Sequence, residues 1–129
     1  MELGLKDQAV LITGSSRGIG RGIAEGFITE NSRIILTGRD KVTLNATASG
    51  FRKKYDVDKV LCFIGDIQLE ENLKSLNKFI GETIGGLNHL VCNIGSGQSM
   101  PPLEEDVKEF QRMLDINLLN AVGVVNKLC

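Results

Sequence analysis

Three glycines with the spacing Gly-x-x-x-Gly-x-Gly follow a short apolar run and precede a segment compatible with a helix: Gly14, Gly18 and Gly20. A glycine at position 14 lets the chain leave a strand in a backbone conformation that other residues avoid. Glycines at positions 18 and 20 remove Cβ atoms where a pyrophosphate and a neighbouring strand must approach closely. The first N–H groups of the next helix would then face the phosphate charge. The stretch predicts a dinucleotide-binding strand–turn–helix unit, with a purely structural turn as the alternative.

A second group of residues bears on which dinucleotide would bind. Gly38 and Arg39 follow the second apolar run, where an acidic residue would hold the ribose hydroxyls of NAD. Arg17 lies inside the glycine turn and can reach the same region. Two guanidinium groups there would bind the 2′-phosphate of NADP through charge-assisted hydrogen bonds. We therefore expect NADP rather than NAD, with two solvated surface arginines as the alternative. Asp40 would mildly favour NAD, but we interpret it as the N-cap of the next helix.

The elements that must position these residues alternate along the whole chain. Apolar runs predict strands at residues 8–12, 33–37, 59–65 and 87–92, and helical spacing predicts helices at residues 18–30, 41–54, 69–84 and 103–128. The nearly continuous apolar character of the strands is typical of a parallel sheet that is covered on both faces. This alternation predicts an α/β fold, a Rossmann-like doubly wound parallel sheet with the strand order 3-2-1-4.

The last predicted helix, residues 103–128, is apolar on two sides. One stripe consists of Val107, Phe110, Leu114, Leu118, Ala121, Val122 and Val125, and further apolar residues lie partly off it. One side can cover the sheet, and the other needs a partner. We expect self-association through this helix, giving a homo-oligomer.

The stretch Thr13-Gly14-x-x-x-Gly18-Ile19-Gly20 resembles the glycine motif of the short-chain dehydrogenase/reductase family. The resemblance implies that the turn, including Ser16, Arg17 and Ile19, binds the cofactor. It implies that Asp66 hydrogen-bonds the adenine amino group and that Ile67 packs on the adenine ring.

Two further marks of the family lie later in the chain. The stretch Asn93-Ile94-Gly95 resembles the Asn-Asn-Ala-Gly turn that passes the cofactor ribose, with Cys92 replacing the first Asn and Ile94 replacing Ala. Asn117 corresponds to a helical Asn that holds a water in the family's proton relay, and a polar residue bonded to nearby backbone is the alternative.

The resemblance implies hydride transfer between a nicotinamide and a carbonyl or alcohol substrate. The family's catalytic Ser and Tyr-x-x-x-Lys have no counterpart in the 129 residues. Tyr55 and Lys59 have the spacing, but they lie at the sheet end opposite the cofactor. Residues 1–129 are thus interpreted as the N-terminal half of an NAD(P)-binding domain, truncated before the fifth strand and inactive alone. A non-catalytic nucleotide-binding or dimerisation module is the alternative.

Composition excludes several other functions. The net charge of −1 gives no electrostatic basis for a nucleic-acid or anionic-membrane partner, and no apolar run is long enough to span a bilayer. The N-terminus does not resemble a signal peptide, so we expect a cytoplasmic location. Three cysteines far apart and the single His89 argue against a metal site or disulfide framework. We expect Cys62 and Cys92 to be buried as small hydrophobic residues.

Overall fold

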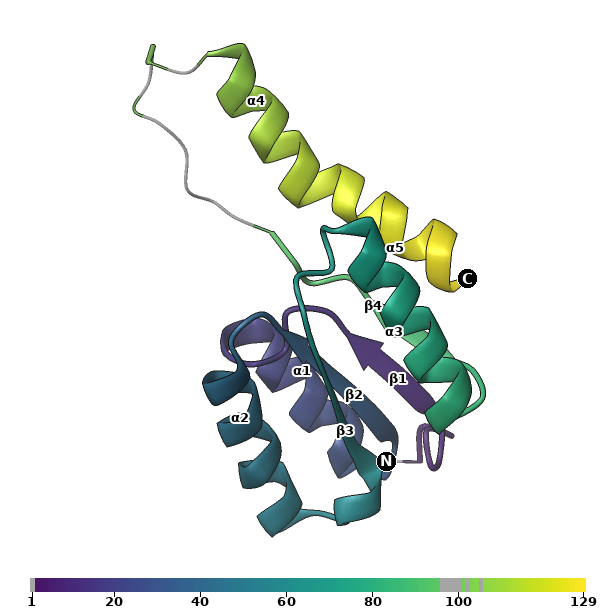
Figure 1. Ribbon diagram of the computed structural model, residues 1–129. Coiled ribbons are helices and arrows are strands. Elements are labelled where there is room, and N and C mark those ends of the chain that lie inside the picture. The colour runs from purple at the N-terminus through teal and green to yellow at the C-terminus, as the bar shows by residue number, and fades with distance from the viewer. Residues whose placement is uncertain (1, 96–100, 102, 105) are drawn as a thin grey trace.

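The computed structural model describes residues 2–95, 101, 103–104 and 106–129. Its sheet has the predicted parallel order β3-β2-β1-β4 (Figure 1). The strands are β1 (Ala9–Ile12), β2 (Arg33–Gly38), β3 (Val60–Ile64) and β4 (His89–Val91). Successive strands pair in register, with Leu11 opposite both Ile35 and Leu90. All four carboxyl ends therefore meet at one edge of the sheet.

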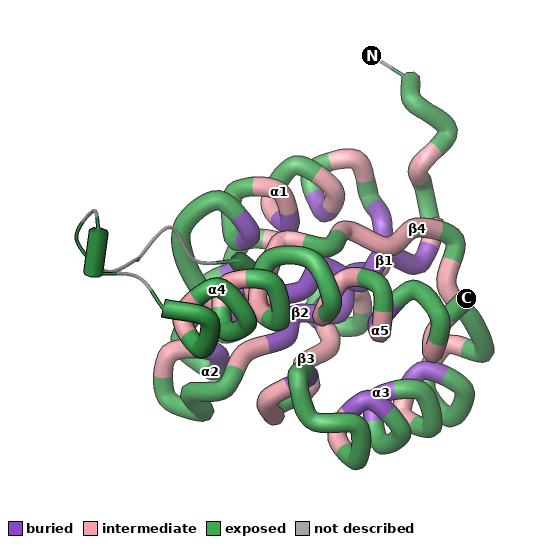
Figure 2. Tube along the Cα trace, turned by 90° about the horizontal axis from the view of Figure 1, so that it is seen from above, coloured by how far each residue is buried: buried purple, intermediate pink, exposed green. Residues whose placement is uncertain are grey.

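Helices cover both faces of this sheet, as predicted. On one face lie α1 (Gly18–Thr29) and α2 (Lys41–Lys54), and on the other lie α3 (Glu70–Thr83) and α5 (Asn120–Leu128). Side chains alternate along each strand, so Val10 and Ile12 pack against α1 and α2 while Leu11 packs toward α3. Seen from above, the buried residues concentrate on β1 and β2 in the middle of the molecule (Figure 2).

The ends of the first three helices follow the sequence closely. Asp40 caps α2, because its carboxylate accepts hydrogen bonds from the Val42 N–H (2.8 Å) and the Thr43 N–H (3.3 Å). Past the end of α1, Asn31 takes a left-handed conformation (φ +63°), and past α3 Gly85 does the same (φ +78°). Lys59 does not begin the third strand as predicted. It ends a short 3-10 turn, η1 (Val57–Lys59), and β3 starts at Val60.

The last predicted helix differs most from expectation. Helix α4 (Val107–Leu114) starts four residues later than predicted, because Leu103 has a positive φ (+70°) and Asp106 supplies the N-cap. A π-helical segment, η2 (Asp115–Leu119), joins α4 to α5. Figure 1 shows that α4 extends past the carboxyl edge of the sheet, while α5 lies beside α3. Only the second half of the long helix therefore covers the sheet.

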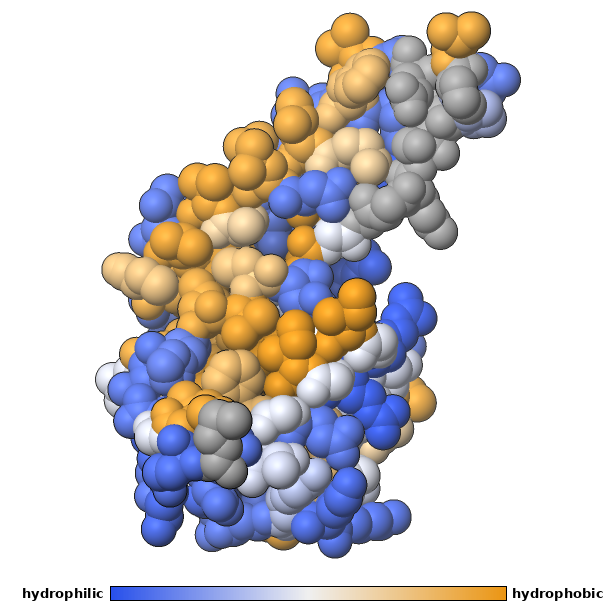
Figure 3. Space-filling view, turned by 180° about the vertical axis from the view of Figure 1, so that it is seen from behind, coloured by the Kyte–Doolittle hydropathy of each residue, from blue (hydrophilic) through white to orange (hydrophobic). Residues whose placement is uncertain are grey.

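The apolar stripe on this helix is exposed to solvent. Its exposed members are Val107, Phe110, Leu114, Leu118, Val122 and Val125. Figure 3 shows hydrophobic residues in a band along the upper part of the molecule. Within residues 107–129, Val124 is the one buried residue. The side of this helix that was expected to cover the sheet therefore consists of Val124 and a few half-buried neighbours.

None of the helices that the structure describes is long and apolar enough to cross a lipid bilayer.

Candidate functional site

A cleft of about 1010 Å³ opens at the carboxyl edge of the sheet. The turns after all four strands line it, together with residues of α4 and η2. Most of the residues that the sequence predicts to bind a cofactor meet here: Gly14, Ser16, Arg17, Gly18, Ile19, Arg39, Asp66, Ile67, Asn93 and Gly95. Gly20 does not line the cleft; it is buried directly beneath the turn.

The three glycines of the turn each occupy a distinct environment. Gly14 (φ +61°) and Gly18 (φ +60°) take backbone conformations that favour glycine. A Cβ on Gly18 would have no atom within 4 Å, so the floor of the cleft is open at this point. A Cβ on Gly20 would collide with the Gly14 carbonyl oxygen and lie 2.6 Å from Asn93 Nδ2. Gly20 therefore serves close packing, while Gly18 leaves room for a ligand.

Buried hydroxyl groups hold the turn against β2. Ser15 Oγ donates to the Ile12 carbonyl (2.8 Å) and accepts from the Thr37 N–H (2.9 Å). Thr47 Oγ1, from α2, donates to the Ser16 carbonyl. These hydroxyls satisfy backbone groups that would otherwise be buried without partners. Sequence reasoning missed Ser15, Thr37 and Thr47, since a hydroxyl alone does not indicate which backbone group it will meet.

Asn93 connects the turn after β4 to the glycine turn. Its backbone N–H donates to Thr13 Oγ1 (2.8 Å), and its Nδ2 donates to the Gly14 carbonyl (3.2 Å). Thr13 Oγ1 in turn donates to the Val91 carbonyl (3.3 Å). The replacement of the preceding Asn by Cys92 therefore does not leave the two turns unconnected.

Charges concentrate where β2 ends. Arg17 and Arg39 are exposed and line the cleft, and Asp40 lies between them and α2. Hydrogen bonds from the Thr43 and Val42 backbone lower the pKa of Asp40, and the Arg17 charge lowers it further. Because its carboxylate is engaged at the helix N-terminus, Asp40 acts as the predicted cap.

The turn after β3 presents Asp66 and Ile67. One oxygen of the half-buried Asp66 carboxylate accepts from the Gln68 N–H (3.0 Å). Ile67 is buried in the core on the α3 face, and its carbonyl accepts from Asn120 Nδ2 (3.2 Å). Asp66 thus shapes its own turn, and it borders the cleft as predicted. Ile67 is 1% exposed, which corrects the expectation that its side chain packs on an adenine ring, because that side chain is part of the core.

Asn117 lies in the π-helical segment rather than in a regular helix. It is exposed and does not line the cleft, but its Oδ1 atom is 2.8 Å from the position that a Cβ on Gly95 would take. Gly95 does line the cleft. The glycine therefore permits close contact between η2 and the turn after β4, which places Asn117 at the cleft border. π-helical turns in otherwise regular helices are frequent at functional sites.

Two residues of the long helix line the cleft without having been predicted to do so: Arg112 and Ile116. They lie four positions apart and so share one face of the helix. Neither lies three or four positions from Asn117, so helical spacing from that residue would not have identified them.

The Tyr55 and Lys59 pair is separate from the cleft, as predicted. The Tyr55 hydroxyl lies 3.2 Å from Thr29 Oγ1 and 3.4 Å from a carboxylate oxygen of Glu25. Lys59 Nζ donates to the Asn31 carbonyl (2.9 Å) and pairs with Asp7. These contacts connect neighbouring elements at the opposite end of the sheet.

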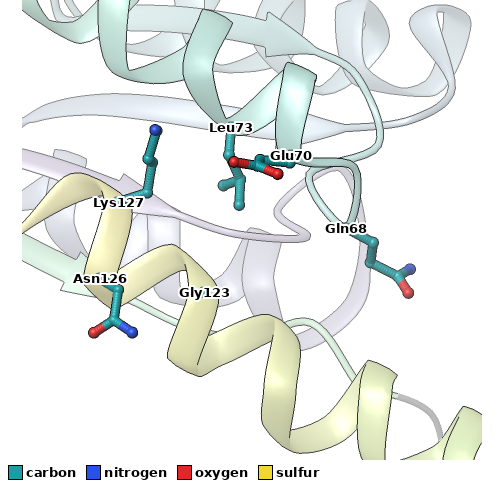
Figure 4. Close-up of a pocket in the computed structure, with 6 residues that line it drawn as sticks. All are labelled: Gln68, Glu70, Leu73, Gly123, Asn126 and Lys127. Carbon is teal, nitrogen blue, oxygen red and sulfur yellow. The ribbon is translucent and has the colours of Figure 1, made fainter.

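A second, smaller pocket of about 340 Å³ lies between α3 and α5. Glu70 and Leu73 of α3 and Lys127 of α5 point into the space between the two helices (Figure 4). Gly123 leaves this space open, because it carries no side chain. Gln68 lines both this pocket and the cleft.

The cysteines do not form a site. Cys62 is half buried, and burial raises the pKa of its thiol. Cys92 is exposed, which corrects the expectation that it is buried, because it follows the last residue of the edge strand β4. Within the residues that the structure describes, no three His, Cys, Asp or Glu side chains lie close enough to hold a metal ion.

Comparison with known proteins agrees with the fold. The sequence model described as short chain dehydrogenase matches residues 8–129. A very-long-chain 3-oxoacyl-CoA reductase from Scheffersomyces stipitis is 35% identical over 118 residues, covering 88% of this chain and 33% of that protein.

Among solved structures, L-sorbose reductase from Gluconobacter frateurii, complexed with NADPH and L-sorbose, superimposes with a TM-score of 0.91. It is 30% identical, and the match covers 99% of this chain and 48% of that one. The NADP complex of RhlG from Pseudomonas aeruginosa is 25% identical with a TM-score of 0.86, over 96% of this chain and 47% of that one. The chain thus spans between a third and about half of the length of these relatives. By the family match over nearly all of its residues, the chain belongs to the short-chain dehydrogenase family.

Proposed function

We propose that residues 1–129 form the NADP-binding part of an oxidoreductase that transfers hydride between the nicotinamide and a small carbonyl or alcohol substrate. The observation that carries the proposal is the cleft itself. In it the glycine turn, the N-terminus of α1 and the arginines 17 and 39 border one space. The NADPH and NADP complexes of the two structural relatives support the same cofactor.

The chemistry of the cleft fits this cofactor. The open floor at Gly18 and the first N–H groups of α1 suit a diphosphate. Arg17 and Arg39 suit the 2′-phosphate, and the second residue after β2, Asp40, is already occupied as a helix cap. Asp66 would hold the adenine, whereas the Ile67 side chain stays in the core. Asn93 and Gly95 would pass the nicotinamide ribose.

The nicotinamide supplies the hydride, and the chain's own residues bind and orient it. We assign Asn117 to holding a water of the proton relay, because Gly95 brings its amide to the cleft border. A Ser and a Tyr-x-x-x-Lys pair are needed to complete proton transfer, and the part of the chain that the structure describes offers no such set at the cleft. We therefore expect nucleotide binding without turnover from these residues alone.

A thermal-shift titration with NADPH and NADH tests the proposal. NADPH should raise the melting temperature more than NADH, and Arg39→Glu should abolish the difference. A ligand at 100 times its dissociation constant adds about 2.7 kcal/mol to the free energy of unfolding. The matched control is Lys53→Glu, which reverses an exposed charge on α2 outside the cleft. Equal shifts with both nucleotides would contradict the choice of NADP, and no shift with either would contradict nucleotide binding.

We also propose that the chain forms a homo-oligomer through the exposed stripe of α4, η2 and α5. Six large apolar side chains on one surface exceed the scattered exposure that is normal for a monomer. The same observation favours the alternative function, a non-catalytic dimerisation module. The nucleotide titration described above distinguishes this module from the cofactor-binding part of an oxidoreductase.

A further inference from the structure

The hydroxyl group of Thr47 reaches the glycine turn from α2. Thr47 is 4% exposed, and its Oγ1 donates to the carbonyl of Ser16, 31 positions away in the sequence. The other buried residues on this face of α2 are apolar and belong to the core: Leu44, Ala48 and Phe51. A hydroxyl among such residues costs free energy unless it is hydrogen-bonded. The contact with the turn therefore accounts for the one polar residue on the buried face of this helix.

The Ser16 carbonyl belongs to the peptide group that leads into Arg17. Because a peptide group is planar, holding its carbonyl oxygen also fixes the direction of the Arg17 N–H and the position of its Cα. Arg17 is the extended N-cap residue of α1 (φ −160°, ψ 174°). Its side chain lines the cleft and makes no capping hydrogen bond to the helix. Thr47 therefore acts at the point where the Arg17 side chain leaves the turn.

The end of β2 lies against the same peptide group from another direction. A Cβ on Gly38 would lie 3.2 Å from the Ser16 Cβ, so these two residues are in close contact. Arg17 follows Ser16 in the chain as Arg39 follows Gly38, and both arginines line the cleft. The contact between Ser16 and Gly38 thus brings the two arginines to the same end of β2.

The earlier part of the glycine turn is held by other groups. The Gly14 carbonyl accepts from Asn93 Nδ2 (3.2 Å), and the Ser15 N–H donates to a carbonyl of β2 (3.0 Å). Neither contact involves α2. Loss of the Thr47 hydroxyl should therefore disturb the position of Arg17 more than that of Gly14.

We propose that Thr47 is a positioning residue for the 2′-phosphate of NADP: its hydroxyl holds the Ser16 carbonyl, and this directs Arg17 toward the site that Arg17 shares with Arg39. The inference rests on the proposed binding of NADP. It goes beyond that proposal by assigning part of the preference for NADPH over NADH to a buried residue of α2 that does not touch the cofactor.

Equilibrium binding of NADPH and NADH to Thr47→Val tests the proposal. Valine has nearly the shape of threonine but cannot donate to the Ser16 carbonyl. NADPH should bind about tenfold more weakly than to the unmodified protein, because a misplaced Arg17 loses a charge-assisted contact. NADH has no 2′-phosphate, so its affinity should change less than about twofold. The preference for NADPH, measured as the ratio of the two dissociation constants, should therefore fall.

Three further variants separate positioning from a general effect on the fold. Thr47→Ser keeps the hydroxyl and should retain the preference. Thr47→Ala removes the hydroxyl in a residue that favours helix, and it tests the same contact if Thr47→Val does not fold. The matched control is Phe51→Leu, because Phe51 lies one turn later on the same buried face and outside the cleft. It should lower the melting temperature and leave the preference unchanged.

The outcomes distinguish this inference from the proposed function. A preference that is unchanged in Thr47→Val and Thr47→Ala overturns the assignment of Thr47 and leaves the NADP site intact. An equal loss of preference in Phe51→Leu or in Thr47→Ser also overturns it, since the hydroxyl would then not be the cause. Failure of the unmodified protein to bind NADPH more tightly than NADH overturns the proposed choice of cofactor together with this inference.

Discussion

Gly20 is the residue where the smallest change should have the largest effect on the site. Gly20→Ala places a methyl group against the Gly14 carbonyl and the Asn93 amide, so α1 must move away from the turn. We expect a loss of about 1–3 kcal/mol in the free energy of unfolding, as is usual for overpacking, and weaker nucleotide binding. Chemical denaturation and NADPH titration measure the two effects.

The matched control for this change is Gly22→Ala, in the same helix. A Cβ on Gly22 would meet no atom within 4 Å, and alanine is favoured over glycine in a helix by about 1 kcal/mol. Gly22→Ala should therefore leave nucleotide binding unchanged and stabilise the fold slightly. Equal destabilisation by both substitutions would contradict the close-packing role of Gly20.

Asp40 gives the α2 cap a pH dependence. Its pKa is lowered in the folded state, so its contribution to stability is present above the ordinary value of 3.8 and is lost as pH falls through the lowered value. Asp40→Asn keeps a capping oxygen but cannot ionise. The unmodified protein should melt at a higher temperature than Asp40→Asn at pH 6, and the difference should shrink as the pH falls below the ordinary value of 3.8. A difference that is constant over this range would show that the charge does not stabilise the cap.

The sequence predicted the backbone of the site better than its side-chain network. The glycine turn and the Asp40 cap are local, since each is defined by residues within a few positions of one another. Ser15 and Thr37 are 22 residues apart, and Thr47 bonds Ser16 across 31 residues. Such partners are brought together only by the register of the sheet and the packing of α2.

Val124 is the one fully buried side chain through which helix α5 packs on the rest of the molecule. This side chain is fully buried with Leu76 and Ile80 of α3, whereas the adjacent Val125 is 45% exposed. Val124→Ala removes two methyl groups from the core and should cost about 2 kcal/mol. Val125→Ala should change the free energy of unfolding by less than about 0.5 kcal/mol. Urea denaturation of both variants tests the attachment, and similar losses would mean that Val125 is also covered.

The long helix also shows which structural features the apolar repeat of the sequence does not predict. An apolar repeat of 3.6 residues predicts one regular helix, and it extends through residues 107–128 with little interruption. It does not predict that residues 115–119 widen into a π-helical turn, which lies against the loop at Gly95. It also does not predict that the helix begins only at Val107, after Leu103 takes a positive φ.

At the scale of the whole molecule, strand order and layering follow from the alternation of strands and helices. Parallel strands with helical crossovers place helices on both faces, and right-handed crossovers then allow few topologies. What covers the outer surface of α4, η2 and α5 is not specified by these rules. The exposed stripe of α4, η2 and α5 lies outside both core clusters, so packing among the described residues does not account for it.

The last prediction concerns self-association through this exposed stripe. Leu118 (53% exposed) and Phe110 (58% exposed) lie on the stripe, and a glutamate at either position would place a charge inside the interface. Leu118→Glu and Phe110→Glu should shift the mass in analytical ultracentrifugation from a multiple of 14.0 kDa to 14.0 kDa. Val42→Glu, on α2 and 78% exposed, controls for the added charge and should leave the mass unchanged. The unmodified protein sedimenting at 14.0 kDa would contradict association. A multiple that persists in both stripe variants would place the interface elsewhere, for which the outer edges of β3 and β4 are the candidates among the described strands.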